Sequence, residues 1–278
     1  MGGLSKKSAF ITSIRANNNT PVLLLDAGNM LFRQHTLPVA AGEAEAARIK
    51  AKGLVVANQQ IGLSFSGIGA NDLAAGPGFL KSTSDKGFTW LSLNLIDRHS
   101  SQPIFPGYTK VQTGGLSVAV LAVTNHENAA AASDASYRVR PWQELLPALV
   151  AQLRSEADML ILLSNYPLSE NREIARSCPE LDMIFQSGYA MGNLPPLVAG
   201  NALISQTEIR GRYLGLLEID WQGHGDWQQR ARGAVSEGKS AGSVFNQRFI
   251  PLNAAIPDDP VMDALVQRIE QQAQAAAR

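Results

Sequence analysis

The alternation of apolar and polar positions along the chain predicts strands that alternate with helices. Three short apolar runs, at residues 22–25, 118–123 and 159–163, each stop at polar or small residues. A short continuous apolar run bounded by such residues is typical of a strand buried on both faces. Apolar spacing and composition predict helices at residues 2–14, 43–60, 141–155, 171–177 and 260–277. The last of these should place Val261, Leu265 and Ile269 on one inward face.

The remaining pattern predicts five further strands, three of them after residue 180. Further strands are predicted at residues 61–68, 88–96, 181–185, 203–207 and 212–220. Residues 69–76 are expected to form a small-residue loop, and residues 222–243 a polar, glycine-rich loop. Strands that alternate with helices, followed by extra strands, favour a layered α/β domain with a mixed sheet or two sheets.

The first apolar run is the segment of most functional interest. Residues 22–25 lead directly into Asp26, Ala27, Gly28 and Asn29. Polar residues at the carboxyl end of a buried strand lie where open α/β sheets place their binding sites, and Gly allows close backbone approach. The alternative is that Asp26 only caps the turn. We predict that the three apolar runs are neighbours in one sheet and that Asn29 and Asn165 face one pocket.

Composition and charge exclude several classes of protein. The 278 residues carry 24 Lys and Arg against 24 Asp and Glu, which leaves no electrostatic footprint for nucleic acid or an anionic membrane. The single cysteine, Cys178, excludes an internal disulfide framework and a Cys-rich metal site. No apolar run reaches the roughly 18 residues of a membrane span. The first residues contain no apolar stretch of the kind a signal peptide needs.

Seven segments, taken in order, resemble a known family. They are Gly2-Gly3-Leu4, VLLLDAGN-x-LF, G-x-N-D-L-x-x-G, FTWLSLNLID, ADMLILLSN, LDMIFQSG and RGRYLGLLEID. Together they resemble the catalytic domain of the 5′-nucleotidase/UDP-sugar hydrolase (UshA-like) branch of the calcineurin-like metallophosphatases, over nearly the whole chain. No single segment is specific; the order and spacing carry the resemblance.

The resemblance implies a fold and a location. The expected fold is α/β, a four-layer α/β/β/α sandwich with mixed sheets. Residues 1–278 should form a single domain that lacks the family's first strand and its C-terminal nucleotide-specificity domain. By the same resemblance the chain is expected in the periplasm or another extracytoplasmic space, as part of a larger protein or complex.

The family's two metal ions are held by carboxylates and imidazoles, and this chain differs at those positions. The bridging Asp of the family falls on Asn29, its Asn-His pair on Ala70-Asn71, and its strand-end His on Asn165. The Gly-His-x-His segment falls on residues 187–190, which contain no His. Asp72 stands where the family has Glu, and Asp26 matches the Asp before the family's ligand. An amide oxygen can bind a metal, but it brings no charge to hold two dications.

These differences favour a degenerate domain that acts as a binding or structural module, a pseudoenzyme without catalytic residues, metal or cofactor. A residual pocket for a small polar or phosphate ligand is predicted at Asp26, Asn29, Asn71, Asp72, Asn165 and Ser187. The same side chains could instead only satisfy exposed strand ends. The alternative function is a metal-dependent phosphohydrolase of 5′-nucleotidase type that uses a divalent ion such as Mn or Zn.

Three other features are weighed against simpler explanations. His126 lies in the string Asn125-His126-Glu127, which resembles a catalytic motif but occurs at a later strand exit than the family's. Cys178 is expected to be a small buried apolar residue. The four tryptophans are expected to be packing residues.

Overall fold

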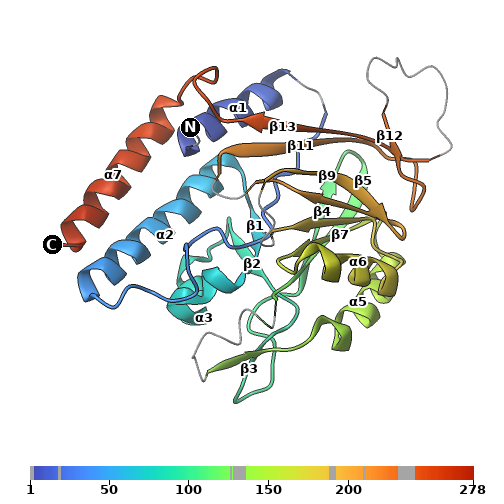
Figure 1. The fold of residues 1–278 in the computed structure, drawn as a ribbon, viewed down its shortest axis with the longest axis horizontal. Coiled ribbons are helices and arrows are strands. Elements are labelled where there is room, and N and C mark those ends of the chain that lie inside the picture. The colour runs from blue at the N-terminus through green and yellow to red at the C-terminus, as the bar shows by residue number, and fades with distance from the viewer. Residues whose placement is uncertain are drawn as a thin grey trace.

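The computed structural model describes residues 3–17, 20–125, 127, 136–187, 192–208, 211–230 and 242–278 (Figure 1). His126 and residues 188–190 lie outside these ranges. The described helices, two of them short 3-10 segments, are α1 (Leu4–Asn17), α2 (Ala41–Ile61), η1 (Ala70–Ala75), α3 (Gly76–Thr83), η2 (Trp142–Glu144), α5 (Leu146–Arg154), α6 (Leu168–Ser177) and α7 (Pro260–Ala276).

The described strands form one large sheet and three smaller ones. In chain order they are β1 (Phe65–Gly67), β2 (Thr89–Leu91), β3 (Leu95–Asp97), β4 (Tyr108–Thr113), β5 (Leu116–Val123), β6 (Tyr137–Val139), β7 (Met159–Ser164), β8 (Met183–Gln186), β9 (Leu194–Ala199), β10 (Ala202–Gln206), β11 (Tyr213–Asp220), β12 (Gln228–Gln229) and β13 (Val244–Pro251). The smaller sheets are β1-β2, β3-β6 and β11-β13-β12.

The large sheet has the order β4-β5-β7-β8-β10-β9. Its four central strands are parallel, whereas β4 and β9 pair antiparallel at the two edges. Because β5, β7, β8 and β10 run in the same direction, their carboxyl ends meet at one edge of the sheet. This edge brings together Thr124, Asn165, Ser187 and Gln206 at or just after the strand ends.

Side chains alternate between the two faces of this sheet, and each face has its own core. On β5, Val118 and Val120 belong to an apolar cluster with residues of β1, β2, β11 and β13, whereas Ala119 and Leu121 belong to one with residues of α5 and α6. Apolar residues on both faces explain why the strand reads as a continuous apolar run. The large sheet is therefore the inner layer between a second layer of strands and the helices α5 and α6.

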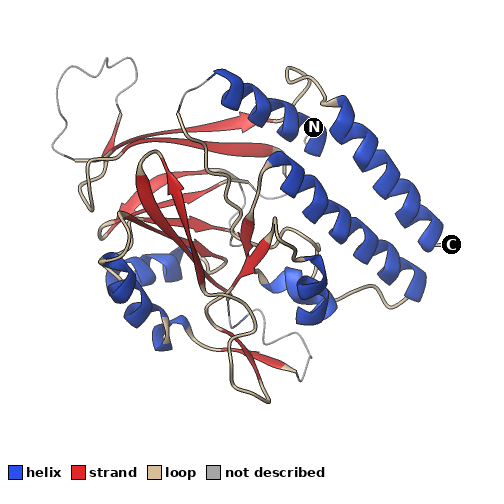
Figure 2. Ribbon diagram, turned by 180° about the vertical axis from the view of Figure 1, so that it is seen from behind, coloured by secondary structure: helices blue, strands red, loops and turns tan. Residues whose placement is uncertain are grey.

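The fourth layer consists of α1, α2 and α7, which lie together beyond β11 and β13 (Figures 1 and 2). Ile11 of α1, Ala57 of α2 and Met262 of α7 meet in one apolar cluster, against which Leu214 of β11 packs. The four layers α, β, β and α follow from helices with one apolar face and sheets with two.

The segment at residues 22–25 is not a strand of the large sheet, so that prediction was wrong. It is extended but forms no strand, and its apolar residues are only half-buried. Leu23 and Leu25 pack on the core between the sheets, while Leu24 faces the α2 side. One backbone bond, from the Gly67 N–H to the Asp26 carbonyl (3.0 Å), ties its end to β1. The predicted neighbours at residues 118–123 and 159–163 do pair, as β5 and β7.

Three other segments differ in detail from their prediction. Residues 69–76 hold the 3-10 helix η1 rather than a loop, and residues 88–96 break into β2 and β3. On α7, Val261 is 74% exposed, and Met262 takes the inward position instead. Leu265 and Ile269 do face inward as predicted, since Leu265 packs on the cluster around Met262 and Ile269 packs on Gly53 of α2. None of the helices in the described ranges is long and apolar enough to cross a membrane.

Candidate functional site

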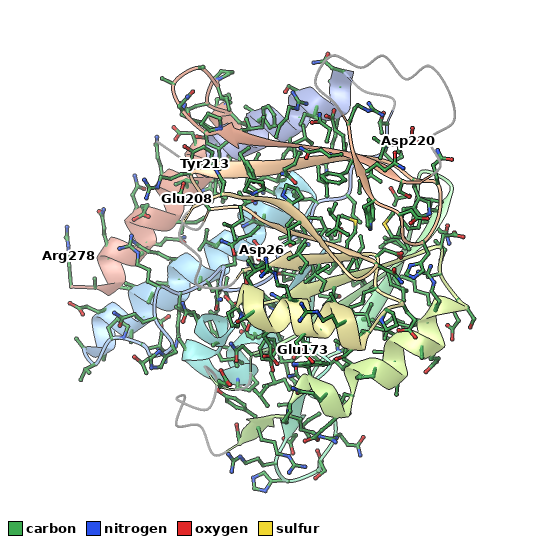
Figure 3. All side chains as sticks on the ribbon, turned by 45° about the vertical axis from the view of Figure 1, so that its right-hand side comes forward. Asp26, Glu173, Glu208, Tyr213, Asp220 and Arg278 are labelled. Carbon is green, nitrogen blue, oxygen red and sulfur yellow. The ribbon has the colours of Figure 1, made fainter. Side chains whose placement is uncertain are left out.

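The predicted site residues gather where the end of the 22–29 segment meets η1 and the carboxyl edge of the large sheet. Asp26 lies near the middle of the molecule, whereas Asp220 and Arg278 lie at its periphery (Figure 3). Asn29 occupies a left-handed conformation with φ 64°, directly after Gly28 with φ 100°. These two positive φ values turn the chain sharply, so that the Asn29 side chain meets η1.

Asp72 is the fully buried centre of this arrangement. Its Oδ2 accepts hydrogen bonds from the backbone N–H groups of Asn29 (2.7 Å) and Gly69 (2.9 Å). Its Oδ1 accepts one from the N–H of Leu31 (2.8 Å). Burial raises the pKa of Asp72 to about 7, and the charge of Asp26 acts in the same direction, while the three N–H donors oppose both. The carboxylate therefore holds the turn after the 22–25 segment against η1.

The amides of Asn29 and Asn71 link the same two segments from the outside. Asn29 Oδ1 accepts from the Asn71 N–H (3.0 Å), and Asn29 Nδ2 donates to the Ser187 carbonyl (3.3 Å). Asn71 Nδ2 donates to the Arg33 carbonyl (3.3 Å). Ser187 Oγ in turn donates to the Ala27 carbonyl (2.9 Å). Asn29 thus connects η1 with the end of β8.

Asn165 reaches the same place from β7, and its side-chain amide is engaged at both ends. Nδ2 donates to the Ile68 carbonyl (2.7 Å), and Oδ1 accepts from the Asn125 N–H (2.6 Å). An ideal Cβ placed on Gly69, the residue after Ile68, would lie 2.2 Å from Asn29 Oδ1. Asn29 and Asn165 therefore contact adjacent residues of the β1–η1 connection.

The loops close on each other without room for additional side-chain atoms. An ideal Cβ on Gly28 would lie 2.5 Å from the Gly69 backbone nitrogen. Since real Cβ atoms do not approach that closely, Gly28 and Gly69 are the residues that allow this contact. The result is a packed junction of backbone and amide groups at the position predicted for the ligand pocket.

Asp26 and Lys7 are further ionisable side chains at or near the junction. Asp26 accepts from the Gly28 N–H (2.9 Å) and from Ser66 Oγ (3.3 Å). Burial lowers the pKa of Lys7 of α1, and the nearby charge of Asp26 partly offsets this effect. Lys7 Nζ donates to Asn58 Oδ1 (2.7 Å).

These residues do not fit a pair of metal ions. Within the described ranges, no group of three or more His, Cys, Asp or Glu side chains is arranged to hold a metal. Asp72 directs both carboxylate oxygens at backbone N–H groups, and Asn165 has both ends of its amide in hydrogen bonds. Two dications would require anionic oxygens and imidazoles that face a common centre. The described residues of the junction therefore do not supply the ligand set of a two-metal centre.

The described histidines are His35, His99 and His224. His35 and His99 are exposed. His224 Nδ1 is 2.5 Å from the buried Oδ1 of Asp182, whose Oδ2 pairs with Arg154 (2.8 Å). Asp182 directly precedes β8, so this cluster lies at the amino end of the parallel strands, opposite to the junction.

Two participants were missed at the sequence level. Thr124 Oγ1 donates to the same Ile68 carbonyl (2.8 Å) that Asn165 binds. Asn94 Oδ1 accepts from the Thr124 N–H (2.8 Å), and its Nδ2 donates to the Thr124 carbonyl (2.8 Å). Both side chains are buried. The available signal was a polar residue within or directly after an apolar run, such as the Asn of LSLNLI.

With this geometry established, comparison with known proteins identifies the fold. No model of a known protein family matches the chain. Solved structures with similar folds include the calcineurin-like phosphoesterase YfkN from Bacillus subtilis, at a TM-score of 0.74 and 16% identity, over 100% of this chain and 91% of that one. The predicted α/β metallophosphatase fold with mixed sheets is thereby confirmed: the chain has the calcineurin-like metallophosphatase fold.

Other similar proteins carry more specific names. A 5′-nucleotidase precursor of Thermus thermophilus matches at a TM-score of 0.73 and 19% identity, over 99% of this chain and 54% of its own. The sulfate thiohydrolase SoxB of Thermus thermophilus matches at a TM-score of 0.73 and 17% identity, over 99% of this chain and 48% of its own. By sequence, the uncharacterised metallophosphoesterase YunD of Bacillus subtilis (strain 168) is 26% identical over 128 residues, 45% of this chain and 28% of YunD. The chain thus spans about half, or less, of these three proteins.

Proposed function

We propose that this chain is a degenerate member of the UshA-like branch, a metallophosphatase-fold domain that acts as a binding or structural module without two-metal phosphohydrolase activity. The observation that carries the proposal is the set of hydrogen bonds that Asp72 accepts. Its carboxylate accepts three backbone N–H bonds instead of facing outward. A carboxylate so engaged holds loops together, whereas a metal ligand needs a free lone pair directed at the ion.

The magnitude of the catalytic task supports the same proposal. Enzymes lower the barrier to phosphate-ester hydrolysis by on the order of 20 kcal/mol. Most of this comes from charge placed against the reacting oxygens and from an activated water. The amides of Asn29, Asn71 and Asn165 can position a phosphate but cannot lower the pKa of a bound water toward neutrality.

A residual ligand would have to use the partly exposed rim of the junction. Asn29, Asn71 and Asp26 are half-buried, in contrast to Asp72 and Asn165. The proposed ligand is small and polar. A phosphate is the less favourable choice, because the Asp26 carboxylate would repel it. The proposed setting is a larger extracytoplasmic protein or complex, in keeping with the resemblance to the UshA-like branch.

Metal content and turnover test this proposal together. The chain is expressed in medium supplemented with Mn or Zn, and its metal content is measured by elemental analysis. Release of phosphate from AMP, UDP-glucose and an aryl phosphate is measured with added Mn, Zn, Co or Mg. We expect no stoichiometric metal and background turnover.

The alternative, a metal-dependent phosphohydrolase of 5′-nucleotidase type, makes the opposite prediction. About one metal per chain, together with phosphate release that Asp26→Asn abolishes, would establish it. Asp226→Asn serves as a matched control, because Asp226 lies in the loop between β11 and β12, far along the chain from the junction. A contaminating phosphatase would be insensitive to both variants.

A further inference from the structure

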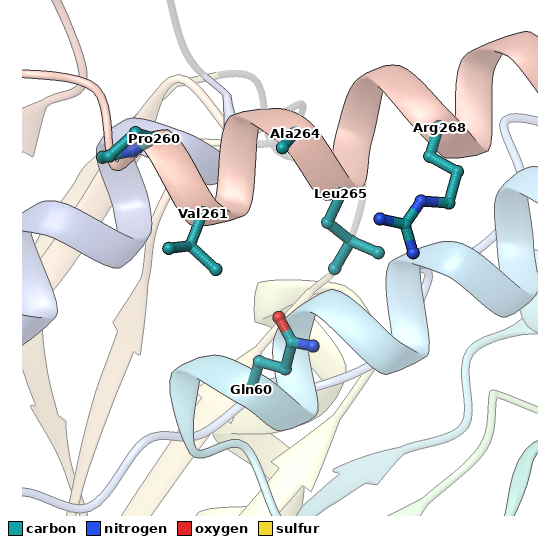
Figure 4. Close-up of a pocket in the computed structure, with 6 residues that line it drawn as sticks. All are labelled: Gln60, Pro260, Val261, Ala264, Leu265 and Arg268. Atoms are coloured by element: carbon teal, nitrogen blue, oxygen red, sulfur yellow. The ribbon is translucent and has the colours of Figure 1, made fainter.

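The outer face of the helical layer carries an open groove of about 430 Å³ between α2 and α7 (Figure 4). The two helices run antiparallel: Gly42 near the start of α2 contacts Ala276 near the end of α7, and Gly53 contacts Ile269. The groove is lined by Gln60 of α2 and by Pro260, Val261, Ala264, Leu265 and Arg268 of α7. Figure 4 shows Leu265 and Gln60 facing each other across it.

The apolar part of the groove is exposed beyond what folding requires. Val261 lines the groove and is 74% exposed, and Leu265 beside it is half-buried. The neighbouring Met262 supplies the inward contact of α7 instead. Val261 and Leu265 therefore form a short apolar strip on the surface, bordered by Gln60 and Arg268.

The polar groups of the groove have no partners. Among the described residues, Arg268 forms no hydrogen bond or ion pair, and neither does the side-chain amide of Gln60. The adjacent surface differs, because Lys50 of α2 pairs with Glu270 of α7 at 2.8 Å. The residues of α7 that line the groove include no carboxylate. The groove therefore combines an apolar floor with one uncompensated positive charge.

We propose that this groove binds an amphipathic helix of a partner protein whose apolar side chains cover Val261 and Leu265 and whose Asp or Glu pairs with Arg268. Val261, Leu265 and Arg268 share one face of α7, because they are spaced by four and then three positions. A helix laid along this face can meet them with its own side chains at i, i+3, i+4 and i+7. A guanidinium at the end of such a strip selects a carboxylate by bidentate pairing.

A second copy of this chain complements the groove poorly. The groove-lining face of another α7 would bring apolar residues and a further Arg268, but no carboxylate. Covering Arg268 without a partner for its charge is unfavourable. The proposal goes beyond the function proposed above and does not depend on it, since none of its residues belongs to the junction around Asp72.

Designed peptides test the surface directly. The probe is a fluorescent helical peptide with Leu at positions i, i+3 and i+7 and Glu one turn further on. Its matched control carries Lys in place of Glu. We measure binding to the full chain by fluorescence anisotropy. The Glu peptide should bind saturably, and at least about tenfold more tightly than the Lys peptide.

Variants of the chain locate the binding. Val261→Glu should weaken binding of the Glu peptide by at least about tenfold. Val39→Glu is the matched control, since Val39 is fully exposed outside the groove, and should leave binding unchanged. Arg268→Glu should reverse the preference toward the Lys peptide. All three positions are exposed, so these variants should fold normally.

Three results would overturn the proposal. The first is the absence of saturable binding, and the second is equal binding of the Glu and Lys peptides. The third is a dimer, detected by sedimentation of the chain alone, that Val261→Glu dissociates; it would assign the groove to a second copy.

Discussion

At the scale of single residues, the buried carboxyl group of Asp72, which stands where the family has Glu, joins two segments of the fold. It joins Asn29 and Leu31, which follow the 22–25 segment, to Gly69, which precedes η1. These bonds satisfy three buried backbone N–H groups, each of which would cost about 1–3 kcal/mol if left without a partner. Asn71 and Asn165 add amide contacts to the same junction.

Replacing Asp72 should therefore reduce stability. Asp72→Asn keeps the shape but turns an amide NH₂ toward at least one backbone N–H. At pH 4, where the raised pKa keeps Asp72 protonated in the folded state, the expected loss in free energy of unfolding is about 2–3 kcal/mol. Urea unfolding measures it. Asn71→Asp, a conservative change at the half-buried rim, is the control and should change stability much less.

The raised pKa of Asp72 is tested by measuring the free energy of unfolding of the native protein and of Asp72→Asn as a function of pH. Its folded pKa is about 7 against 3.8 in the unfolded chain, so the folded state binds this proton more tightly. The contribution of this proton to stability is complete below about pH 4 and is lost as pH rises through 7. Relative to Asp72→Asn, the native protein should lose up to about 1.4 kcal/mol per pH unit in this window. If the native protein instead gained stability relative to Asp72→Asn as the pH rises, the backbone donors would be holding the carboxylate ionised.

Cys178 is predicted to be inert. Burial raises the pKa of its thiol to about 12, and the nearby charge of Glu180 adds to this effect. Because the thiolate is the reactive form, a thiol reagent at pH 8 should not label the native protein. In denaturant one equivalent should react, since the chain has a single cysteine. Rapid labelling of the native chain would contradict this prediction.

At the scale of elements, α7 is held at its start and along its length by different means. Asp259 caps its N-terminus, where Oδ1 accepts from the N–H groups of Val261 (2.9 Å) and Met262 (3.2 Å). Ser8 of α1 donates to Asp259 Oδ2 (2.6 Å), so the cap also joins two helices. Further along, Ile269 packs into the space above Gly53 of α2.

Asp259→Ala should lower stability by about 1 kcal/mol, the usual cost of losing an N-cap. The hydrogen bond from Ser8 and those from the helix backbone hold the pKa of Asp259 below its usual 3.8. This stabilisation is therefore present above pH 4 and is lost as the pH falls below about 4. Thermal unfolding at pH 7 and pH 3 should show a smaller effect of the substitution at pH 3. Asp263→Ala, within the first turn, should have little effect at either pH.

The close approach of α2 and α7 predicts an unusual response to alanine. Gly53→Ala should favour the helix intrinsically by up to about 1 kcal/mol. The new Cβ, however, would lie 2.5 Å from Ile269 Cδ1, with two further Ile269 side-chain atoms within 2.7 Å. Because a branched side chain cannot move aside easily, overpacking should dominate, with a net loss of about 1–3 kcal/mol. Gly78→Ala in α3, where a Cβ meets nothing within 4 Å, should be neutral or stabilising. Equal effects would refute the packing argument.

At the scale of the whole molecule, the junction depends on segments from several elements, so a few substitutions should not create a two-metal centre there. The triple variant Asn29→Asp, Asn71→His, Asn165→His is expected to bind no stoichiometric Mn or Zn. Asn165→His should also lower the thermal midpoint, since it removes the bonds to the Ile68 carbonyl and the Asn125 N–H. Elemental analysis and thermal unfolding measure both effects. About one metal per triple-variant chain would show that the site had remained open.

Local sequence pattern was sufficient for the elements with strong periodicity. Residues 159–164 were predicted as a strand with a polar end and form β7, and the predicted helix at 43–60 corresponds to α2 (Ala41–Ile61). Periodicity reports which faces of an element are buried, and this suffices for long or uniformly apolar segments. The order of seven segments further indicated the metallophosphatase fold.

The roles of the site residues, in contrast, follow from how distant segments assemble. Whether residues 22–25 join a sheet depends on a free strand edge beside them, which periodicity does not report. Whether Asp72 faces a ligand or the N–H of Leu31 depends on how segments 41 residues apart meet. Asn165 bonds to Ile68 across 97 residues of sequence. The sequence indicated which polar residues lie near the junction. Packing fixes the direction of each donor and acceptor, because a hydrogen bond requires a distance and an angle that only the assembled layers define.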